Sequence, residues 1–565
     1  MSGRTNIDKR TKREYSVEYH TFLHVNHKMN KKFSLSLKFI LPIIFVFLFC
    51  QILLIFKKYP NDYSIIYSQP IQEDPDSGIL SPSKEFSSEH NSLLPKIQFD
   101  FPAESSKERK VREYRKESIK QGFLHSWKGY SKYAWGADEV EPLSNTSRRH
   151  LNGWGATMVD ALDTMWIMDL KEEFNNATNY LSGVDFTNSY MDINFFETVI
   201  RYLGGLLSAH ELSGNIILLQ KAKDLGEVLY HAFNSQSGLP YNHWYMGNKY
   251  SRGILAEVGS SQLEYMKLAQ LTGNGSYFDV VQKVIDTFDK AKKSIPGLYP
   301  IYIDLDTGEF SVDEISVGNF GDSFYEYLLK QYILVGGSND QYKRMYEESA
   351  ENIVKYLVKE GQVKDNPELL FIGSYSYGRI NPKMDHLSCF VPGMLAIGSK
   401  ILNRSRDLDV AIRIAEACYW SYNVTATGIG PENFIFLPKD DSSNDDQFNQ
   451  FPMKKSDTRY LLRPETIESL FVLYRITGDK KYQERGWKIW ESIEKWCKTP
   501  TAYSGLQDVT SETPQQNNNM ESFFLAETIK YLYLLFSTPD VISLDTYVFN
   551  TEAHPFIIQN KSLNT

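Results

Sequence analysis

The sequence has no excess of positive charge and only one long hydrophobic run. Both features limit the classes of protein to which the chain can belong. Acidic residues outnumber basic ones by 70 to 61, for a formal net charge of -9. A nucleic-acid-binding protein would usually present a basic face, so that class is disfavoured and no nucleic-acid partner is expected. Cysteine is also scarce, with four in 565 residues. Hydrophobic residues reach 42% and aromatics 14%, which favours a large globular unit over a disordered chain.

The one long hydrophobic run, residues 39–56 (FILPIIFVFLFCQILLIF), contains no charged residue. As a helix it would extend roughly 27 Å, close to the thickness of a bilayer's hydrocarbon core. A cleaved signal peptide would have a shorter apolar core nearer the N-terminus; a buried core helix is the other alternative. Lysines and arginines crowd the preceding segment, while Lys57 and Lys58 oppose them weakly. The pattern predicts a cytosolic tail over 1–38 and a single transmembrane signal-anchor over 39–56, with the rest of the chain lumenal.

The region after this run divides into a polar stretch and a patterned one. Residues 57–110 are rich in Ser, Pro, Asp and Glu with little periodicity, which predicts a flexible stem before a folded domain over 111–565. N-x-S/T sequons, typical of secreted glycoproteins, all lie on the predicted lumenal side: Asn145, Asn176, Asn274, Asn403, Asn423 and Asn560. Cys50 lies in the hydrophobic run, whereas Cys389, Cys418 and Cys497 lie where disulfides persist. Three cysteines cannot be paired from sequence alone.

A unit of two helical stretches joined by a polar turn recurs from Leu151 onward. The predicted turns fall near Lys171, Gly214, Gly273, Gly337, Arg404, Gly478 and Pro539. Short strand-like stretches such as 297–310 (GLYPIYIDLDTGEF) are expected to be β-hairpins inserted between helix pairs. The pattern predicts an all-α protein of seven helical hairpins, either an open solenoid or a closed α/α barrel. The irregular repeat length, and carboxylates in the first helix of most pairs, favour a closed (α/α)7 ring around a polar cavity.

Four helical segments carry the candidate carboxylates. Glu197 and Arg201 stand four apart on one helix face, beside the unusual mid-helix pair Gly204 and Gly205, which indicates that something approaches that backbone closely. A surface ion pair is the alternative for Glu197 and Arg201. The other candidates are Asp322 and Glu326 in 321–334, Glu465 and Glu468 after Pro464, and Phe523 with Glu527 in 520–536.

Each of these segments also has an ordinary structural explanation. Asp322 could be a helix N-cap. Glu465 and Glu468 could complement the dipole of a helix whose first residue is Pro464. Phe523 and Glu527 could form an ordinary core edge. Glycoside hydrolysis, however, needs one carboxylic acid to protonate the leaving oxygen and a second carboxylate to attack or to activate water, and inner helices of a ring could supply such a pair.

Taken together, these segments closely resemble glycoside hydrolase family 47, the class I α-1,2-mannosidases, and in particular their endoplasmic-reticulum type. The matching blocks include GWGATMVDALDTMWIMDL (153–170), FFETVIRYLGGLLSAHELSG (195–214), GDSFYEYLLKQ (321–331), HLSCFVPGML (386–395), LLRPETIESLFVLYRITGD (461–479), MESFFLAET (520–528) and YVFNTEAHP (547–555). The resemblance spans about residues 120 to 560. It implies a barrel of seven helical hairpins and an inverting exo-hydrolase that trims α-1,2-linked mannose from high-mannose N-glycans on glycoproteins (Man9GlcNAc2 to Man8GlcNAc2).

The resemblance also implies the site residues. Glu197 would be the general acid, Glu465 the base that activates water, and Asp322 a third essential acid. The expected substrate-binding or cavity-lining positions are Arg201, Glu264, Glu326, His386, Glu432, Arg463, Glu468, Phe523, Glu527 and Glu552. Thr551 would bind a calcium ion, Ca2+, through its hydroxyl and carbonyl oxygens. Cys389 and Cys418 would form the family's disulfide, leaving Cys497 free.

One position departs from the family pattern. The endoplasmic-reticulum members carry arginine two residues before the catalytic aspartate, where this chain has Phe320. We therefore expect a broader or altered choice of glycan branch. The expected residence is the endoplasmic reticulum membrane as a single-pass type II protein, with the early Golgi as the alternative, and a monomer is expected. A second hypothesis is a mannose-binding quality-control relative with weak catalysis; a third is a protein-binding helical solenoid.

Overall fold

The computed structural model describes residues 94–189, 191–245, 248–249, 251–363, 366, 368–440 and 453–559. The predicted tail, the hydrophobic run 39–56 and most of the predicted stem lie outside these residues. Within them, no helix is long and apolar enough to cross a membrane. The chain divides into two units, Met1–Pro82 and Ser83–Thr565, and only the second is described below.

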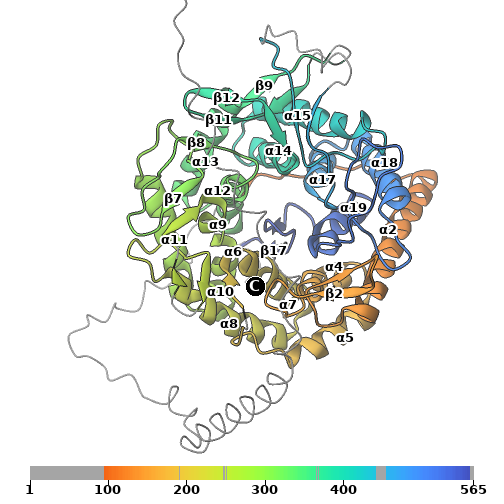
Figure 1. Cartoon of the computed structure of the whole chain (residues 1–565), viewed down its shortest axis with the longest axis horizontal. Coiled ribbons are helices and arrows are strands. Elements are labelled where there is room, and N and C mark those ends of the chain that lie inside the picture. Colours follow the sequence, from red (N-terminus) through yellow and green to blue (C-terminus); the bar gives the residue numbers. More distant parts are fainter. Residues whose placement is uncertain are drawn as a thin grey trace, which may run out of the picture. The chain divides into compact units, whose positions relative to one another are not determined.

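The second unit is a ring of paired helices (Figure 1). The inner helices are α4 (Leu162–Ile167), α7 (Gly204–Ser213), α10 (Gln262–Thr272), α12 (Asp322–Leu334), α14 (Val391–Ile401), α17 (Glu465–Thr477) and α19 (Ile529–Leu535). Their outer partners, in the same order, are α5 (Lys171–Ser182), α8 (Ile216–Tyr230), α11 (Ser276–Lys290), α13 (Asp340–Asn352), α15 (Ser405–Asn423), α18 (Lys481–Trp496) and α2 (Ser106–Tyr133). From α4 to α19 each inner helix also contacts the next one, and the Lys530–Asp163 ion pair joins α19 to α4. The predicted helical ring is confirmed for the described residues.

The burial of each helix follows its side-chain pattern. Outer helix α11 buries a single stripe of Tyr277, Val281, Val284, Ile285 and Phe288, as expected for an amphipathic helix with one face on a core. Inner helix α12 is buried on nearly every face, charged residues included. Polar groups buried in this way need partners, and those partners make up the site described below.

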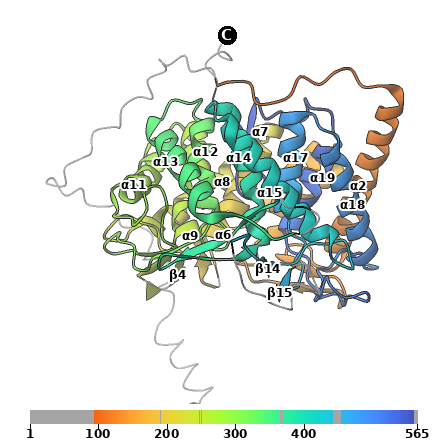
Figure 2. The same cartoon turned by 90° about the horizontal axis from the view of Figure 1, so that it is seen from above.

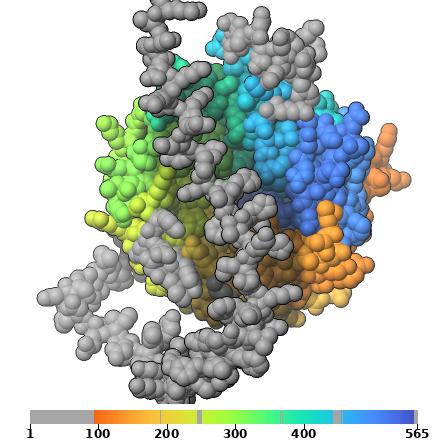
Figure 3. Space-filling model, viewed as in Figure 1, coloured from red at the N-terminus to blue at the C-terminus, as the bar shows by residue number. Residues whose placement is uncertain are grey.

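One prediction is wrong: the turn near Pro539 does not lead into the second helix of a seventh hairpin. Among the described residues that follow α19, no helix is present; the chain instead forms strands β16 (Tyr547–Phe549) and β17 (Pro555–Ile557). The outer partner of α19 is α2, from the other end of the domain. Figure 3 shows the orange early residues against the blue late ones where the ring closes. The prediction paired only helices that are adjacent in the sequence. A ring that is closed by helices from distant segments leaves no local sequence pattern.

The remaining elements are short. The helical turns are α3 (Ala156–Asp160), α6 (Phe195–Glu197), α9 (Leu255–Gly259), η2 (His231–Phe233) and η4 (His386–Phe390), and the π-helical segments are η1 (Thr198–Leu203), η3 (Ile353–Leu357) and η5 (Phe524–Thr528). The strands are β1 (Glu139–Glu141), β2 (Thr146–Arg148), β3 (Ile193–Asn194), β4 (His243–Tyr245), β5 (Asn248–Lys249), β6 (Arg252–Ile254), β7 (Tyr302–Asp304), β8 (Glu314–Ile315), β9 (Val358–Glu360), β10 (Leu370–Ile372), β11 (Ser374–Ser376), β12 (Arg379–Asn381), β13 (Lys383–Asp385), β14 (Asn433–Ile435) and β15 (Lys454–Asp457). All pair antiparallel in sheets of two or three strands. Figure 2 shows β4, β14 and β15 gathered at one end of the helices.

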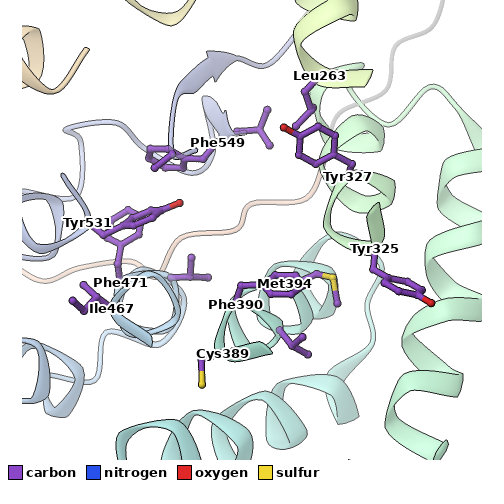
Figure 4. Close-up of a cluster of buried hydrophobic side chains, with 14 of the residues drawn as sticks. Leu263, Tyr325, Tyr327, Cys389, Phe390, Met394, Ile467, Phe471, Tyr531 and Phe549 are labelled. Atoms are coloured by element: carbon purple, nitrogen blue, oxygen red, sulfur yellow. The ribbon is translucent and has the colours of Figure 1, made fainter. Parts of the chain in front are cut away.

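The β16–β17 hairpin occupies the centre of the ring (Figure 1) and packs against α7 and α12. Its Phe549 lies 5.6 Å from the Tyr531 ring and 6.0 Å from the Phe471 ring, centroid to centroid. In Figure 4, Tyr327 and Tyr531 approach from opposite sides of this region with their hydroxyls turned inward. The hairpin therefore closes the apolar interior of the barrel and presents its turn, residues 550–554, to the polar part.

The folded unit begins before residue 111, the boundary drawn from composition. Ile97 is 3% exposed, and its backbone N–H donates to the Asp545 carboxylate at 2.6 Å. Helix α2 then starts at Ser106, with Ser105 and Glu108 forming a capping box. The last part of the predicted stem is thus packed against the barrel, because one apolar residue and a few backbone bonds suffice to dock a segment that lacks periodicity.

Candidate functional site

Glu197 and Arg201 lie at the start of a distorted helix rather than on a surface helix. Glu197 ends α6, where the Asn194 side chain caps its backbone N–H, and Arg201 lies in the π-helical segment η1. The Arg201 Nε donates to Glu197 Oε2 at 2.7 Å. The other side of its guanidinium binds Glu552 of the hairpin turn and the Ser522 hydroxyl. With 11% of its side chain exposed, Arg201 is a buried bridge, so the surface ion pair is excluded.

Glu465 is the first residue of α17, and its carboxylate lies close to two side chains, His386 and Arg463. Its Oε2 lies 2.6 Å from His386 Nδ1, and Arg463 Nη1 is 3.9 Å from Oε1. Burial would raise the pKa of Glu465, but the hydrogen bond and charge of His386 together with Arg463 lower it below its usual value. The second His386 nitrogen lies 2.6 Å from the Tyr422 hydroxyl, which fixes the ring. Glu465 is thereby kept ionised, as a base requires. Helix α17 begins at Glu465 with Pro464 as its cap, one residue later than predicted.

Asp322 has the opposite environment. It is the first residue of α12, after the cap residue Gly321, and its Oδ1 accepts the Ser323 backbone N–H at 3.0 Å. Burial raises the pKa of Asp322 to about 7, with further contributions from the charges of Glu326 and Glu465. Two carboxyl groups at one site, one with a lowered and the other with a raised pKa, can provide a base and an acid near neutral pH.

Further carboxylates converge from other inner helices. Glu326 is buried and bound by Lys330, which also lies 3.9 Å from Glu468. Burial raises the pKa of Glu468 to about 8. Glu527, on the π-helical segment η5, has a pKa well above the usual range because it is buried near Glu552, Glu465 and Glu468. The charge of each of these carboxylates thus affects the pKa of the others, so these acidic residues from different helices lie in one region of the barrel.

The predicted sugar-binding residues frame this region. Phe523 is 9% exposed, and the guanidinium carbons of Arg201 and Arg463 lie 5.6 and 5.8 Å from its ring centroid. Arg463 Nε donates to both Glu432 oxygens, at 2.9 and 2.8 Å. Glu264 is fully buried and lies behind the hairpin turn, where its Oε1 accepts from Tyr327 and Asn550, both at 2.7 Å.

Thr551 lies at the tip of the β16–β17 hairpin and is half-buried. Its backbone N–H donates to the Tyr327 hydroxyl at 3.2 Å. Within the described part of the chain, its hydroxyl and carbonyl oxygens have no hydrogen-bond partner. Two free oxygens, beside buried carboxylates whose charges repel one another, form a donor set of the hard oxygen type that calcium prefers.

The cysteines pair as the resemblance implied. Cys389 of η4 and Cys418 of α15 form a disulfide with their Cα atoms 6.0 Å apart. Cys497 is free and buried, and burial raises the pKa of its thiol. The disulfide joins the segment that carries His386 to the helix that carries Tyr422, so it braces the partners of Glu465.

Sequence reasoning missed several residues of this region. Tyr422 contacts His386, Asn550 contacts Glu264, and Lys330 contacts Glu326 and Glu468. His554 contacts Asp163, which was not predicted either. His554 lies in the family-like block 547–555, but no role was predicted for it. The paired Gly204 and Gly205 did give a usable signal: a Cβ on Gly204 would lie 2.6 Å from Asn550 Nδ2, and one on Gly205 would lie 3.2 Å from His554 Cε1. The predicted close approach to that helix is confirmed. The approaching groups are the hairpin turn and Val159 of α3, whose carbonyl oxygen would lie 2.9 Å from a Cβ on Gly205.

Comparison with known proteins places the whole barrel in one family. The sequence pattern of Glycosyl hydrolase family 47 matches residues 122–558. The endoplasmic reticulum mannosyl-oligosaccharide 1,2-alpha-mannosidase of Rattus norvegicus is 41% identical over 458 residues, covering 79% of this chain and 68% of that protein. The mannosyl-oligosaccharide 1,2-alpha-mannosidase MNS1 of Arabidopsis thaliana is also 41% identical, over 79% of both chains. The solved alpha-1,2-mannosidase from Trichoderma reesei superposes with a TM-score of 0.75 at 33% identity, covering 79% of this chain and 99% of that one.

Proposed function

The chain belongs to glycosyl hydrolase family 47, and from this premise we propose that it is an inverting, calcium-dependent exo-α-1,2-mannosidase. It removes terminal α-1,2-linked mannose from high-mannose N-glycans, beginning with Man9GlcNAc2. The observation that carries the proposal is the opposed protonation of Glu465 and Asp322: His386 and Arg463 hold the first ionised, while burial raises the pKa of the second to about 7. An inverting glycosidase needs one carboxylate as base and one carboxylic acid as proton donor.

The residues divide the chemistry between them. Glu465 accepts a proton from the attacking water, and His386 with Tyr422 holds its carboxylate in place. Glu197 and Asp322 provide the proton that the leaving oxygen takes up, with Arg201 fixing the Glu197 side chain. Phe523 offers an aromatic ring close to two guanidinium groups, and such a ring suits the apolar face of a sugar.

The donor set of the hairpin tip fits a calcium ion. Thr551 would hold it through its two free oxygens, and Glu326, Glu468, Glu527 and Glu552 would surround it at longer range. When bound, calcium would supply a positive charge that coordinates sugar hydroxyls and water. Lys330 and Arg201 compensate only part of the local negative charge, which favours a cation there.

The cellular placement rests on the N-terminal sequence and on the relatives. The uncharged run 39–56, preceded by basic residues, would anchor the protein as a single-pass type II membrane protein with the barrel in the lumen. The named endoplasmic-reticulum relatives favour that compartment. The Cys389–Cys418 disulfide supports the processing enzyme over a lectin-like relative, and disulfides are typical of the secretory pathway.

Branch choice is the feature in which this chain would differ from its endoplasmic-reticulum relatives. Phe320 adopts a positive φ of 74° and is 39% exposed, two residues before Asp322. An exposed apolar ring cannot make the charged hydrogen bonds of an arginine, so recognition of one particular branch would be relaxed.

A time course of mannose release from Man9GlcNAc2 tests the proposal. We expect free mannose with the β anomer formed first, because inversion converts the α linkage, and proton NMR of the released sugar distinguishes the anomers. Release of the α anomer would contradict the inverting mechanism, and no release from an α-1,2-linked glycan would contradict the proposed function.

A further inference from the structure

A second charged cluster lies wholly inside the barrel wall, behind the residues assigned above. Lys530 of α19 and Asp163 of α4 form an ion pair at 2.8 Å with no exposed side-chain surface on either. The other Asp163 oxygen lies 2.8 Å from His554 Nδ1, and His554 Nε2 is 3.4 Å from Asp160 Oδ1. The four side chains therefore form a continuous row, Lys530–Asp163–His554–Asp160, none of which a sugar could touch.

One side of this row is attached to the hairpin turn. Lys530 Nζ donates to the Ala553 carbonyl at 2.6 Å. The Asn550 side-chain oxygen accepts the backbone N–H groups of His554 at 2.8 Å and Glu552 at 3.0 Å. The 553–554 end of the turn is thus fixed to α19 and α4, whereas the Asn550 side chain attaches the other end to η1 and α10. Glu552 and Thr551 lie between these attachment points.

The other side of the row reaches the proposed acid. Asp160 Oδ2 accepts the Ser522 hydroxyl and lies 3.7 Å from Arg201 Nη1. Arg201 in turn binds Glu552 and Glu197. The groups that face Glu197 are Arg201, Glu552 and, from α9, Glu257, whose own pKa rises to about 7 through burial and the charge of Glu197.

Stability alone does not account for such a row. Replacing a fully buried ion pair by well-packed apolar residues is often neutral or stabilising, because the desolvation of both charges is avoided. The row has geometric value instead: each carboxylate lies against at least three side chains from other elements, so the position of Arg201 is tied to the position of the hairpin turn. Burial would lower the pKa of His554, but Asp163 and Asp160 raise it above its usual value. The 3.4 Å approach of its Nε2 to Asp160 Oδ1 is a charge contact rather than a hydrogen bond.

We propose that His554, with Asp163 and Lys530, is a set of positioning residues that holds Arg201 and Glu552 in register and thereby sets the orientation of Glu197. The inference rests on the proposed hydrolase activity. If the row is broken, Asp160 loses its contact with His554 and can turn away from Arg201. The Arg201 guanidinium then loses one of the groups that fix it and can shift, and the Glu197 carboxyl group that it binds shifts with it.

The test uses the whole enzyme, saturating calcium and Man9GlcNAc2, with kcat and KM measured for three variants. His554→Gln breaks the row at its centre. The double variant Asp163→Asn/Lys530→Met removes a positive and a negative charge together, so that no unpaired charge is left buried. His210→Gln is the matched control, since His210 contacts only the Asn215 carbonyl at 2.9 Å among its described partners.

We expect His554→Gln and the double variant to lower kcat by about 10- to 100-fold, as is usual for residues that orient the groups of a site. The loss should fall mainly on kcat, with KM close to that of the unaltered enzyme, because the row does not contact the sugar, while His210→Gln matches the unaltered enzyme. The inference is overturned if both variants keep the original kcat, if KM rises as much as kcat falls, or if lost activity equals the fraction unfolded by circular dichroism. Should His554→Gln fail to fold, the double variant decides alone. An inactive unaltered enzyme would instead refute the proposed function.

Discussion

Removal of the Cys389–Cys418 disulfide offers a prediction whose size follows from the structure. The bridge closes a loop with a sequence separation of 29 residues. In the chain-entropy model, a loop of this length restricts the unfolded chain by about 3.6 kcal/mol at 25 °C. Both half-cystines are buried, so we choose Cys389→Ala/Cys418→Ala, which introduces no new polar group.

The expected change in melting temperature follows from the size of the folded unit. Unfolding entropy of about 2.1 cal/mol/K per residue, applied to the unit that spans residues 94–559, gives a decrease of about 4 °C. Cys497→Ala is the matched control because Cys497 is also fully buried yet unpaired. The change in melting temperature of Cys497→Ala measures the effect of losing one buried sulfur without losing a cross-link.

Thermal unfolding followed by circular dichroism in calcium-containing buffer is the assay. The double variant should melt about 4 °C below the level expected from twice the Cys497→Ala shift, and reductant should lower the unaltered protein toward the double variant. Activity should also decrease, since the bridge joins the segments of His386 and Tyr422. Equal melting temperatures for the double variant and Cys497→Ala would refute the argument that the cross-link stabilises the barrel.

Three other predictions concern the carboxylates and the rim. Glu197→Gln should lower kcat by about 10²- to 10⁴-fold with an unchanged melting temperature; near-normal turnover in a mannose-release assay would remove Glu197 from the chemistry. Burial raises the pKa of Glu264 from 4.5 to about 7, so the folded protein holds a proton that the unfolded chain has released, and stability falls as pH rises between these values. Glu264→Gln should therefore match the unaltered protein near pH 5 and exceed its stability at pH 8, and parallel melting curves across that range would contradict this. Phe320→Arg should restrict trimming, seen as accumulation of one Man8GlcNAc2 isomer by chromatography, whereas the unaltered enzyme should trim further; a lasting single isomer from the unaltered enzyme would show that Phe320 does not broaden branch choice.

The repeat of helical hairpins was predictable because each helix obeys a local rule. Outer helices show one apolar stripe, inner helices are apolar on most faces, and glycines at positive φ end several of them, as at Gly214, Gly273 and Gly478. Such rules need only a window of neighbouring residues. The pairing of α19 with α2 obeys no such rule, since the two helices come from opposite ends of the domain.

The site was predictable where residue types recur at helical spacing, as for Glu197 with Arg201. The row through His554 was not, because its four members come from α3, α4, α19 and the hairpin turn. Nothing in their separate segments distinguishes a buried lysine or aspartate from a solvated one. The paired glycines of α7 marked where the turn would approach, but the identity of the approaching element required the structure.

The central claim is that Glu465 acts as a base at a calcium-dependent mannosidase site, and one measurement tests it most directly. Mannose released from Man9GlcNAc2 is followed over time for the unaltered enzyme and for Glu465→Gln, each with calcium and after exhaustive chelation. We predict that mannose is released only by the unaltered enzyme with calcium, and that release is restored when calcium is returned. Undiminished release by Glu465→Gln, or by the chelated enzyme, would contradict it.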